Sequence, residues 1–211
     1  IQKKETCARA INEWFLVQPH QLHLIYLLYM SLDLIEKEVC DLEQRCKELS
    51  ISVSDLRMIV SIKRQQLFLL KSDSIENIYP ISTSKNPPSC QENSFGTPLG
   101  LHSIAEKIGA GVAKGTVFKA RIPQSYTYEH APIDDRQKNL ITTRIIRIRG
   151  LDPDLNAGVS QDSYDRYIYL HGTNHEDQIG QPFSQGCIEL SNTAIIELFQ
   201  TVSKGDTLWI G

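Results

Sequence analysis

The chain lacks features that mark several well-defined protein classes. It has no basic excess, because 22 Lys and Arg stand against 25 Asp and Glu, for a formal net charge of −3. General nucleic-acid binders are usually strongly basic, so no nucleic-acid partner is predicted. The five cysteines include no Cys-x-x-Cys pair, which argues against a zinc ribbon or a thioredoxin-type redox site.

A phosphate loop and a membrane span are missing too. The glycine-rich stretch 109–115 lacks the Gly-Lys-Ser/Thr ending of a phosphate loop, and we expect a flexible turn there. The apolar stretch 22–35 is interrupted by His23 and Asp33, and it is shorter than the roughly 20 residues that a spanning helix needs. No transmembrane span is therefore predicted. Because the chain begins at Ile1 rather than Met, a removed signal peptide would not be visible.

An amphipathic pattern occupies residues 20–49. Apolar side chains recur there at steps of three and four, which is typical of one face of a helix. These side chains are Leu22, Ile25, Tyr29, Leu32, Ile35, Val39, Leu42, Cys46 and Leu49. Residues 1–50 are predicted to form a helical segment, whose apolar face either packs on the rest of the chain or serves docking or dimerisation.

From residue 51 onward, short β-branched and aromatic runs separated by turn residues predict a mainly β domain with flanking helices. The expected strands are 58–62, 66–70, 78–82, 117–122, 141–149, 167–170 and 207–210, the first two as a hairpin. Residues 85–94 and 151–165 are expected to be loops, the second a lid or rim. Asn192 is expected to cap a helix. Arg144, Arg147 and Arg149 of the strand 141–149 are expected to face solvent, and the alternative is that this basic strand receives a substrate carboxylate.

His171 and Cys187 carry the chemistry that the sequence suggests. The strand 167–170 is expected to hold His171 at its end, beside Gly172. Cys187 follows sixteen positions later, and a loop of that length can bring the thiol and the imidazole together. A free thiol, with a pKa of about 8.5, is mostly protonated at neutral pH, and an imidazole is the usual base that activates it. The pair predicts nucleophilic cysteine catalysis.

The glycine before the cysteine suggests an oxyanion hole. Glycine lets the backbone approach a substrate carbonyl closely, so the N–H groups of Gly186 and Cys187 could stabilise an oxyanion. If Cys187 is a free thiol, four cysteines remain that could form disulfides or stay reduced. These are Cys7, Cys40, Cys46 and Cys90.

Two motifs in the same order resemble the L,D-transpeptidase catalytic domain, the YkuD-like family. The first is His-Gly-Thr at 171–173, followed by Ser-x-Gly-Cys-Ile-x-Leu-x-Asn at 184–192. The second, at 96–107, resembles the family's Thr-Pro-x-Gly-x-aromatic-x-Ile element. The resemblance implies a YkuD-like β-sandwich catalytic domain at 51–211, behind the helical segment.

The chain departs from the family pattern at three positions. Gln185 stands where the family has His before Gly-Cys, and Glu189 stands where Arg is common. His102 replaces the aromatic residue of the upstream element. These departures concern substrate recognition, whereas the cysteine and the histidine are retained.

The resemblance implies a bacterial periplasmic or cell-envelope enzyme that acts on peptidoglycan stem peptides, with no cofactor and no metal. Cys187 would attack the carbonyl of the stem's diamino-acid residue, expel D-alanine and form a thioester. An amine acceptor would then give a crosslink, and water would give L,D-carboxypeptidase activity. The Gly172 carbonyl would hold His171 in the useful tautomer. Residues expected near the substrate are Ser184, Gln185, Gly186, Glu189 and Asn192.

Two alternatives stay open. Gln185 and Glu189 allow a cell-wall-binding module that has lost catalysis. A metallohydrolase would recruit His171, His175, Asp177 and Cys187 as ligands. A His-x-x-x-His ligand pair normally lies on a helix, and a strand end followed by glycine argues against one.

Overall fold

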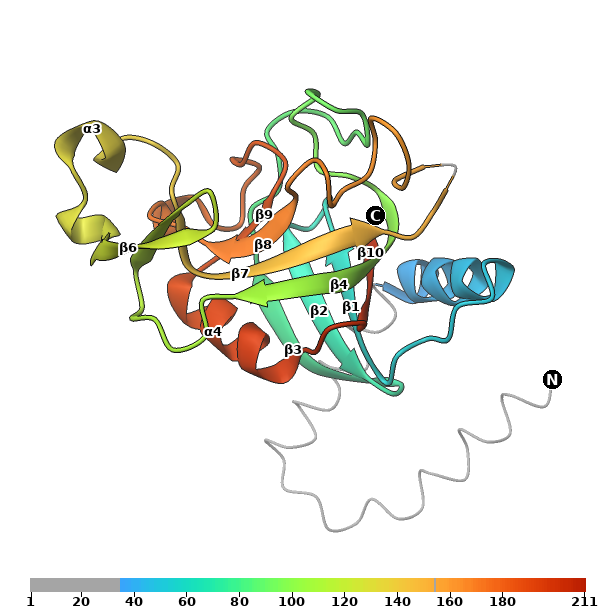
Figure 1. Ribbon diagram of the computed structural model, residues 1–211. Coiled ribbons are helices and arrows are strands. Elements are labelled where there is room, and N and C mark those ends of the chain that lie inside the picture. Colours follow the sequence, from blue (N-terminus) through green and yellow to red (C-terminus); the bar gives the residue numbers. More distant parts are fainter. Residues whose placement is uncertain (1–34, 154) are drawn as a thin grey trace, which may run out of the picture. The chain divides into compact units, whose positions relative to one another are not determined.

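A computed structural model describes residues 35–153 and 155–211, and in them β-strands predominate (Figure 1). The strands are β1 (Leu56–Ser61), β2 (Gln66–Lys71), β3 (Ser74–Pro80), β4 (Gly100–Ile108), β5 (Thr116–Lys119), β6 (Ile122–Thr127), β7 (Ile141–Gly150), β8 (Tyr169–Gly172), β9 (Ile188–Leu190) and β10 (Thr207–Ile210). The helices are a segment at 35–48, the short η2 (Tyr128–His130), α3 (Ile133–Arg136) and η3 (Glu176–Gln178), and α4 (Asn192–Thr201). The predicted mainly β class with flanking helices is confirmed.

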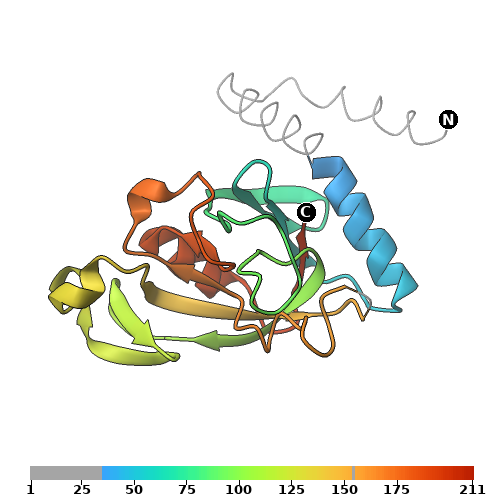
Figure 2. The same cartoon turned by 90° about the horizontal axis from the view of Figure 1, so that it is seen from above.

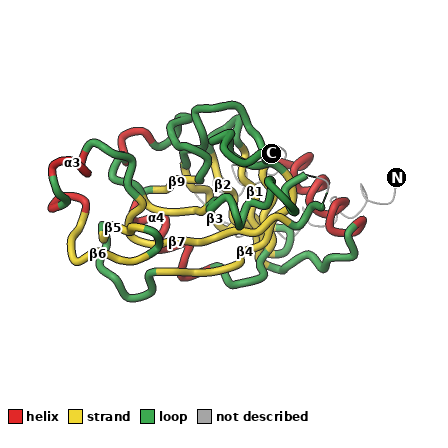
Figure 3. The backbone as a smooth tube through the Cα atoms, turned by 45° about the horizontal axis from the view of Figure 1, so that its top comes forward, coloured by secondary structure: helices red, strands yellow, loops and turns green. Residues whose placement is uncertain are grey.

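The described strands form one hydrogen-bonded sheet in the order β3-β2-β1-β10-β4-β7-β5-β6. Two further strands, β8 and β9, branch from this sheet and are called the strand arm. β8 pairs with β7 on one side and with β9 on the other. The hairpin predicted from the first two strands is confirmed as β1 and β2. The β5–β6 hairpin and α3 lie at the end of the sheet away from β1 (Figure 3).

The main core is formed by the sheet and by α4, which covers the strand arm. Buried side chains from β1, β2, β4, β7, β8, β9, β10 and α4 meet in a single cluster. α4 packs against β7, β8 and β9. The strand arm that carries the motif residues is therefore fixed from behind by apolar packing, which makes it a rigid support for reactive groups.

The helix cap predicted at Asn192 is wrong by one position. Ser191 is the N-cap, since its side chain accepts a hydrogen bond from the Ala194 N–H, and Asn192 is the first helical residue. Both residue types are good caps, so local preference could not separate them. The Asn192 side chain is instead held by hydrogen bonds to Thr142 and Thr173, so Ser191 caps the helix.

Several strand boundaries also differ from the prediction. The run 117–122 is divided between β5 and β6, because Ala120 and Arg121 adopt left-handed conformations with φ of 48° and 69° and reverse the chain. The third strand begins earlier than expected, and Tyr167 precedes β8 with a φ of 57°. β4 and β9 were not predicted as strands at all. β9 is only three residues long and is set by its parallel pairing to β8.

One arginine of β7 is buried, contrary to the expectation that all three face solvent. Arg147 is 7% exposed, its guanidinium lies 3.3 Å from the centre of the Tyr164 ring, and it forms an ion pair with Glu106 at 3.4 Å. The register shift within β7 changes which side chains face inward. The loop 151–165 that supplies Tyr164 contains no strand or helix in its described residues, as predicted.

The N-terminal segment is described only from residue 35, so most of the predicted helix 20–49 and the apolar run 22–35 lie outside the described residues. Residues 37–211 form one compact unit. Within it, Arg45 of the helix forms a two-pronged ion pair with Asp152, at 2.9 and 2.5 Å. No helix in the described part of the chain is long and apolar enough to cross a membrane.

Two loops lie on the same side of the sheet, above the strand arm (Figure 2). One joins β3 to β4, and the other joins β8 to β9. They contact through backbone hydrogen bonds from Phe183 N to Thr83 O at 2.9 Å and from Lys85 N to Ser184 O at 3.2 Å. These bonds fix the turn that presents Cys187.

Candidate active site

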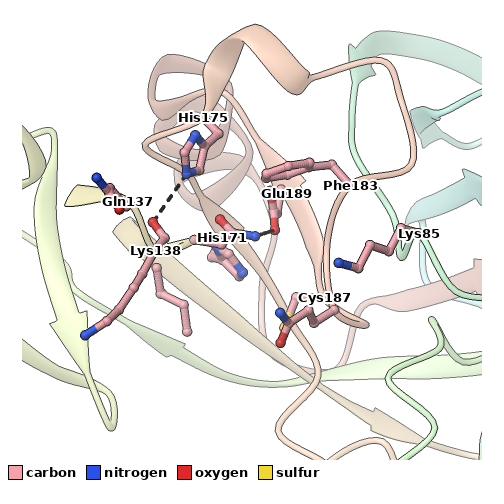
Figure 4. A pocket seen from close by; sticks show the side chains of 11 residues that line it. Lys85, Gln137, Lys138, His171, His175, Phe183, Cys187 and Glu189 are labelled. Carbon is pink, nitrogen blue, oxygen red and sulfur yellow. Dashed lines mark hydrogen bonds between the residues drawn. The ribbon is translucent and has the colours of Figure 1, made fainter. Parts of the chain in front are cut away.

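A pocket of about 560 Å³ opens between the strand arm and the segment that precedes β7 (Figure 4). His171, Cys187 and Glu189 lie on its wall. The other residues that line it are Lys85, Gln137, Lys138, Asn139, Ile141, His175, Phe183 and Gln185. The structure therefore brings together the histidine, the cysteine and the acidic residue that the sequence singled out.

The parallel register of β8 and β9 explains this arrangement. His171 lies directly beside Glu189, and Leu170 lies beside Ile188. Side chains that are paired across neighbouring strands point to the same face, and residues two apart on one strand share that face. Cys187 is two positions before Glu189, so all three side chains reach one side of the arm.

His171 is held with a defined tautomer. Its Nδ1 lies 2.8 Å from the Gly172 carbonyl oxygen, which can only accept, so Nδ1 carries the proton. The other ring nitrogen, Nε2, is then the basic one. The imidazole is 3% exposed, and burial lowers its pKa, while the Glu189 carboxylate and the Gly172 backbone oppose this effect. The ring is therefore neutral at pH 7.

Cys187 is half-buried at the pocket wall, and its thiol lies 3.6 Å from the Tyr167 carbonyl oxygen, which accepts from it. Burial raises the pKa of this thiol to about 12. The Glu189 carboxylate raises that pKa further, and the Tyr169 backbone and the Arg166 guanidinium oppose the rise. The resting thiol is therefore protonated.

Glu189 is almost fully buried at 1% exposure. Asn139 donates a hydrogen bond of 2.5 Å from Nδ2 to its Oε1 atom, while Oε2 has no hydrogen-bond partner among the described residues. The sequence could not identify Asn139, since it lies fifty residues away in a polar connection with no motif. Glu189 thus faces the pocket.

The turn before Cys187 does not support the expected role of the Gly186 N–H in an oxyanion hole. Its N–H donates to the Ser184 hydroxyl at 3.2 Å, so this N–H does not point at a substrate oxygen. The same hydroxyl donates to the Cys187 carbonyl at 2.6 Å, which makes Ser184 a buried brace of the turn rather than a residue of the pocket wall. Gly186 is needed for its backbone conformation, because its φ is 119°.

Asn192 lies beneath the pocket rather than on its wall. Its Oδ1 accepts hydrogen bonds from the hydroxyls of Thr142, at 2.6 Å, and of Thr143. Its Nδ2 donates to the Thr173 carbonyl at 2.8 Å and to Glu176 at 2.7 Å. Asn192 therefore ties β7, the end of β8 and α4 together, and its expected contact with substrate is not supported. Gln185, by contrast, is exposed and lines the pocket.

Neither a metal site nor a disulfide is found in the described part of the chain. No group of three or more His, Cys, Asp or Glu side chains there could hold a metal ion. Asp177, one ligand of the metallohydrolase alternative, does not line the pocket. Cys40, Cys46, Cys90 and Cys187 are free thiols, and Cys7 lies outside the described residues.

A comparison with protein families gives one family match, the L,D-transpeptidase catalytic domain (YkuD), over residues 55–210. The chain belongs to this family. A relative, YqjB of Bacillus subtilis strain 168, is assigned provisionally by its name to the L,D-transpeptidases. It is 25% identical over 162 residues, which are 74% of this chain and 71% of the relative.

Solved structures of L,D-transpeptidases also match. An L,D-transpeptidase from Mycobacterium smegmatis is 16% identical, with a TM-score of 0.45. The match covers 74% of this chain and 58% of that protein's chain. The L,D-transpeptidase LdtMt1, in complex with imipenem, is 19% identical, with a TM-score of 0.48. The match covers 74% of this chain and 59% of the LdtMt1 chain. This chain thus spans less than two thirds of the length of these structures.

Proposed function

We propose that this protein is a cysteine acyltransferase that acts on peptidoglycan stem peptides through a thioester on Cys187. One observation carries the proposal. Cys187 and His171 line one pocket, and the Nδ1 proton of His171 is directed to the Gly172 carbonyl, which leaves Nε2 as the base. Membership of the L,D-transpeptidase family supports the substrate class and a place of action outside the cytoplasm.

In the proposed first half-reaction, Nε2 of His171 takes the thiol proton while Sγ of Cys187 attacks the carbonyl of the penultimate stem residue. The new S–C bond forms a tetrahedral oxyanion. When it collapses, the bond to the terminal D-amino acid breaks, and His171 returns the proton to the leaving amine. Atoms and charges balance without a cofactor.

Proton transfer in this reaction is coupled to the attack rather than completed beforehand. Burial keeps the pKa of the Cys187 thiol high and that of His171 low, so a thiolate–imidazolium pair is not the resting state. Substrate binding must also turn the thiol away from the Tyr167 carbonyl. Since Gly186 already donates its N–H to Ser184, we propose the Cys187 N–H as the oxyanion donor of the turn.

The thioester has two fates in this proposal. Attack by an amine of a second stem gives a crosslink, and attack by water gives L,D-carboxypeptidase activity. Both need the same acyl-enzyme, whereas a binding module that has lost catalysis forms none. For the N-terminal segment 1–50, docking or dimerisation stays a proposal beside packing on the rest of the chain.

Intact-mass analysis after incubation with disaccharide tetrapeptide tests the proposal. We expect the protein mass to rise by the acyl group with release of D-alanine, and we expect no adduct on Cys187→Ala, which removes only the nucleophile. A folded wild-type protein that shows neither adduct nor release would favour the binding module. Adding an amine acceptor then separates crosslink formation from hydrolysis.

A further inference from the structure

The Glu189 side chain has an unsatisfied oxygen where the reaction is proposed to occur. The residue is 1% exposed, Oε1 accepts from Asn139, and Oε2 is buried without a hydrogen-bond partner among the described residues. Burying a carboxylate oxygen without a partner is costly, and such groups in folded proteins usually have a donor. A donor from outside the chain is therefore expected.

The described cations nearby do not supply this donor. Glu189 takes part in none of the ion pairs of the described residues. Lys138, on the pocket wall, bonds Asp135 at 2.8 Å. Lys85 lies at the exposed rim (Figure 4). His171 directs its proton to the Gly172 carbonyl. The carboxylate is thus left with one neutral amide donor.

The position of Glu189 limits what the donor can be. It is paired with His171 across the strand arm and lines the same pocket as Cys187, so a group held by Oε2 lies close to the reacting atoms. A neutral amide could satisfy the hydrogen bond but would leave the negative charge uncompensated. A primary ammonium supplies both a positive charge and N–H donors, and charge-assisted hydrogen bonds are roughly twice as strong as neutral ones.

We propose that Oε2 of Glu189 receives the primary ammonium group of a substrate in this pocket. The identity of the substrate rests on the proposed function. Binding of an ammonium group at Glu189 does not itself require formation of the acyl-enzyme. The ammonium could belong to the acyl donor or to the acceptor, whose amine attacks the thioester after giving one proton to Nε2 of His171. The two sources share the same chemistry, and the experiments below separate them.

The first experiment measures binding without catalysis. Iodoacetamide alkylation of Cys187 is followed with n-butylammonium present, or with butyramide as its neutral counterpart. We expect n-butylammonium, and not butyramide, to slow alkylation of the wild type. Glu189→Gln keeps the shape of the side chain but removes its charge, and it should weaken this protection at least fivefold.

Two further variants control this measurement. Asp177→Asn removes an exposed carboxylate that does not line the pocket, and it should keep wild-type protection. Glu197→Gln makes the same change as Glu189→Gln at an exposed position of α4 that does not line the pocket, and it should keep the protection as well. Equal protection of wild type and Glu189→Gln, or equal protection by butylammonium and butyramide, would overturn the proposal.

The second experiment identifies the source of the ammonium. Stem tetrapeptides with a free or an acetylated side-chain amine are compared as donors, and the ratio of transfer to hydrolysis is measured with an amine acceptor. A preference for the free amine that falls at least fivefold in Glu189→Gln assigns the donor. If only the ratio of transfer to hydrolysis falls in Glu189→Gln, the ammonium belongs to the acceptor. If neither measurement changes in this variant, the proposal is contradicted. Absence of any thioester would contradict the proposed function, while the protection experiment would still decide the ammonium site.

Discussion

At Cys187, the cost of burying a negative charge exceeds the help that the neighbouring groups give to the thiolate. Burial and the Glu189 carboxylate both raise the thiol pKa, and only the Arg166 guanidinium and the Tyr169 backbone act against them. An arginine at position 189 would reverse one of these contributions, because it would place a positive charge beside the thiol. Glu189 is buried in the pocket beside the thiol, so its charge contributes to this balance.

This balance predicts the pH dependence of thiol reactivity. Because only the thiolate alkylates and the pKa of Cys187 is raised to about 12, the iodoacetamide rate should rise about tenfold per pH unit from pH 6 to 9 without a plateau. Glu189→Gln should shift the whole curve to lower pH, since one cause of the raised pKa is removed. A wild-type plateau below pH 8 would show a preformed thiolate and contradict this prediction.

At the scale of elements, the strand arm depends on a buried polar network at its end. Asn192 joins the irregular part of β7, the end of β8 and the first turn of α4 with hydrogen bonds from both side-chain atoms. A Cβ at Gly172 would lie 2.6 Å from Asn192 Oδ1, so the glycine is also required by this close packing. His171 is therefore positioned by a residue that does not touch the pocket.

Asn192→Ala should destabilise the fold and displace the arm. Loss of the amide leaves the buried hydroxyls of Thr142 and Thr143 without their acceptor, which typically costs about 1–3 kcal/mol for each group left unsatisfied. Urea unfolding measures this loss, with Thr193→Ala at the exposed neighbouring position as the control. Wild-type stability together with wild-type acylation in Asn192→Ala would show that the network is dispensable.

The helix segment is joined to the sheet by charged pairs. Arg45 bonds Asp152, and Glu43 lies 3.5 Å from Arg57, a residue of β1 that is nearly buried. A chain that starts at Ser52 loses both contacts, so we expect a lower Tm and poor solubility rather than an independent domain. Arg45→Gln in the full chain should also lower the Tm, whereas Lys47→Ala, at an exposed position, should not. If the shortened chain folds and acylates normally, the helix is separable and a domain boundary near residue 50 is supported.

For the whole molecule, stability is linked to pH through a buried histidine that does not line the pocket. His102 is fully buried, with Nδ1 2.9 Å from the Gly100 carbonyl and Nε2 2.8 Å from the Ser163 hydroxyl. The carbonyl can only accept, so Nδ1 donates and Nε2 accepts from Ser163. Burial lowers the pKa of His102 to about 4, so the ring is neutral in the folded protein. It anchors the loop 151–165 to β4.

Acidification from pH 6.5 to 4 should therefore destabilise the folded protein through His102. The unfolded chain takes up the proton near pH 6.5 and the folded chain only near pH 4, so stability is full above pH 6.5 and falls between these values. The loss is on the order of 3 kcal/mol for this group. We expect His102→Phe to have a flatter dependence of Tm on pH from 6.5 to 4 than the wild type. Parallel curves for the two proteins would contradict this assignment.

The sequence by itself determined much of the mainly β class, the β1–β2 hairpin, the strand that carries His171 and the family motifs, because these depend on local periodicity and on neighbouring residues. Only the tertiary structure decided that Glu189 is buried against Asn139, that the Gly186 N–H donates to the Ser184 hydroxyl, and that Asn192 lies beneath the pocket. These features depend on side chains that are distant in sequence or on the direction of one N–H group. Neither hydrophobic pattern nor local propensity carries that information.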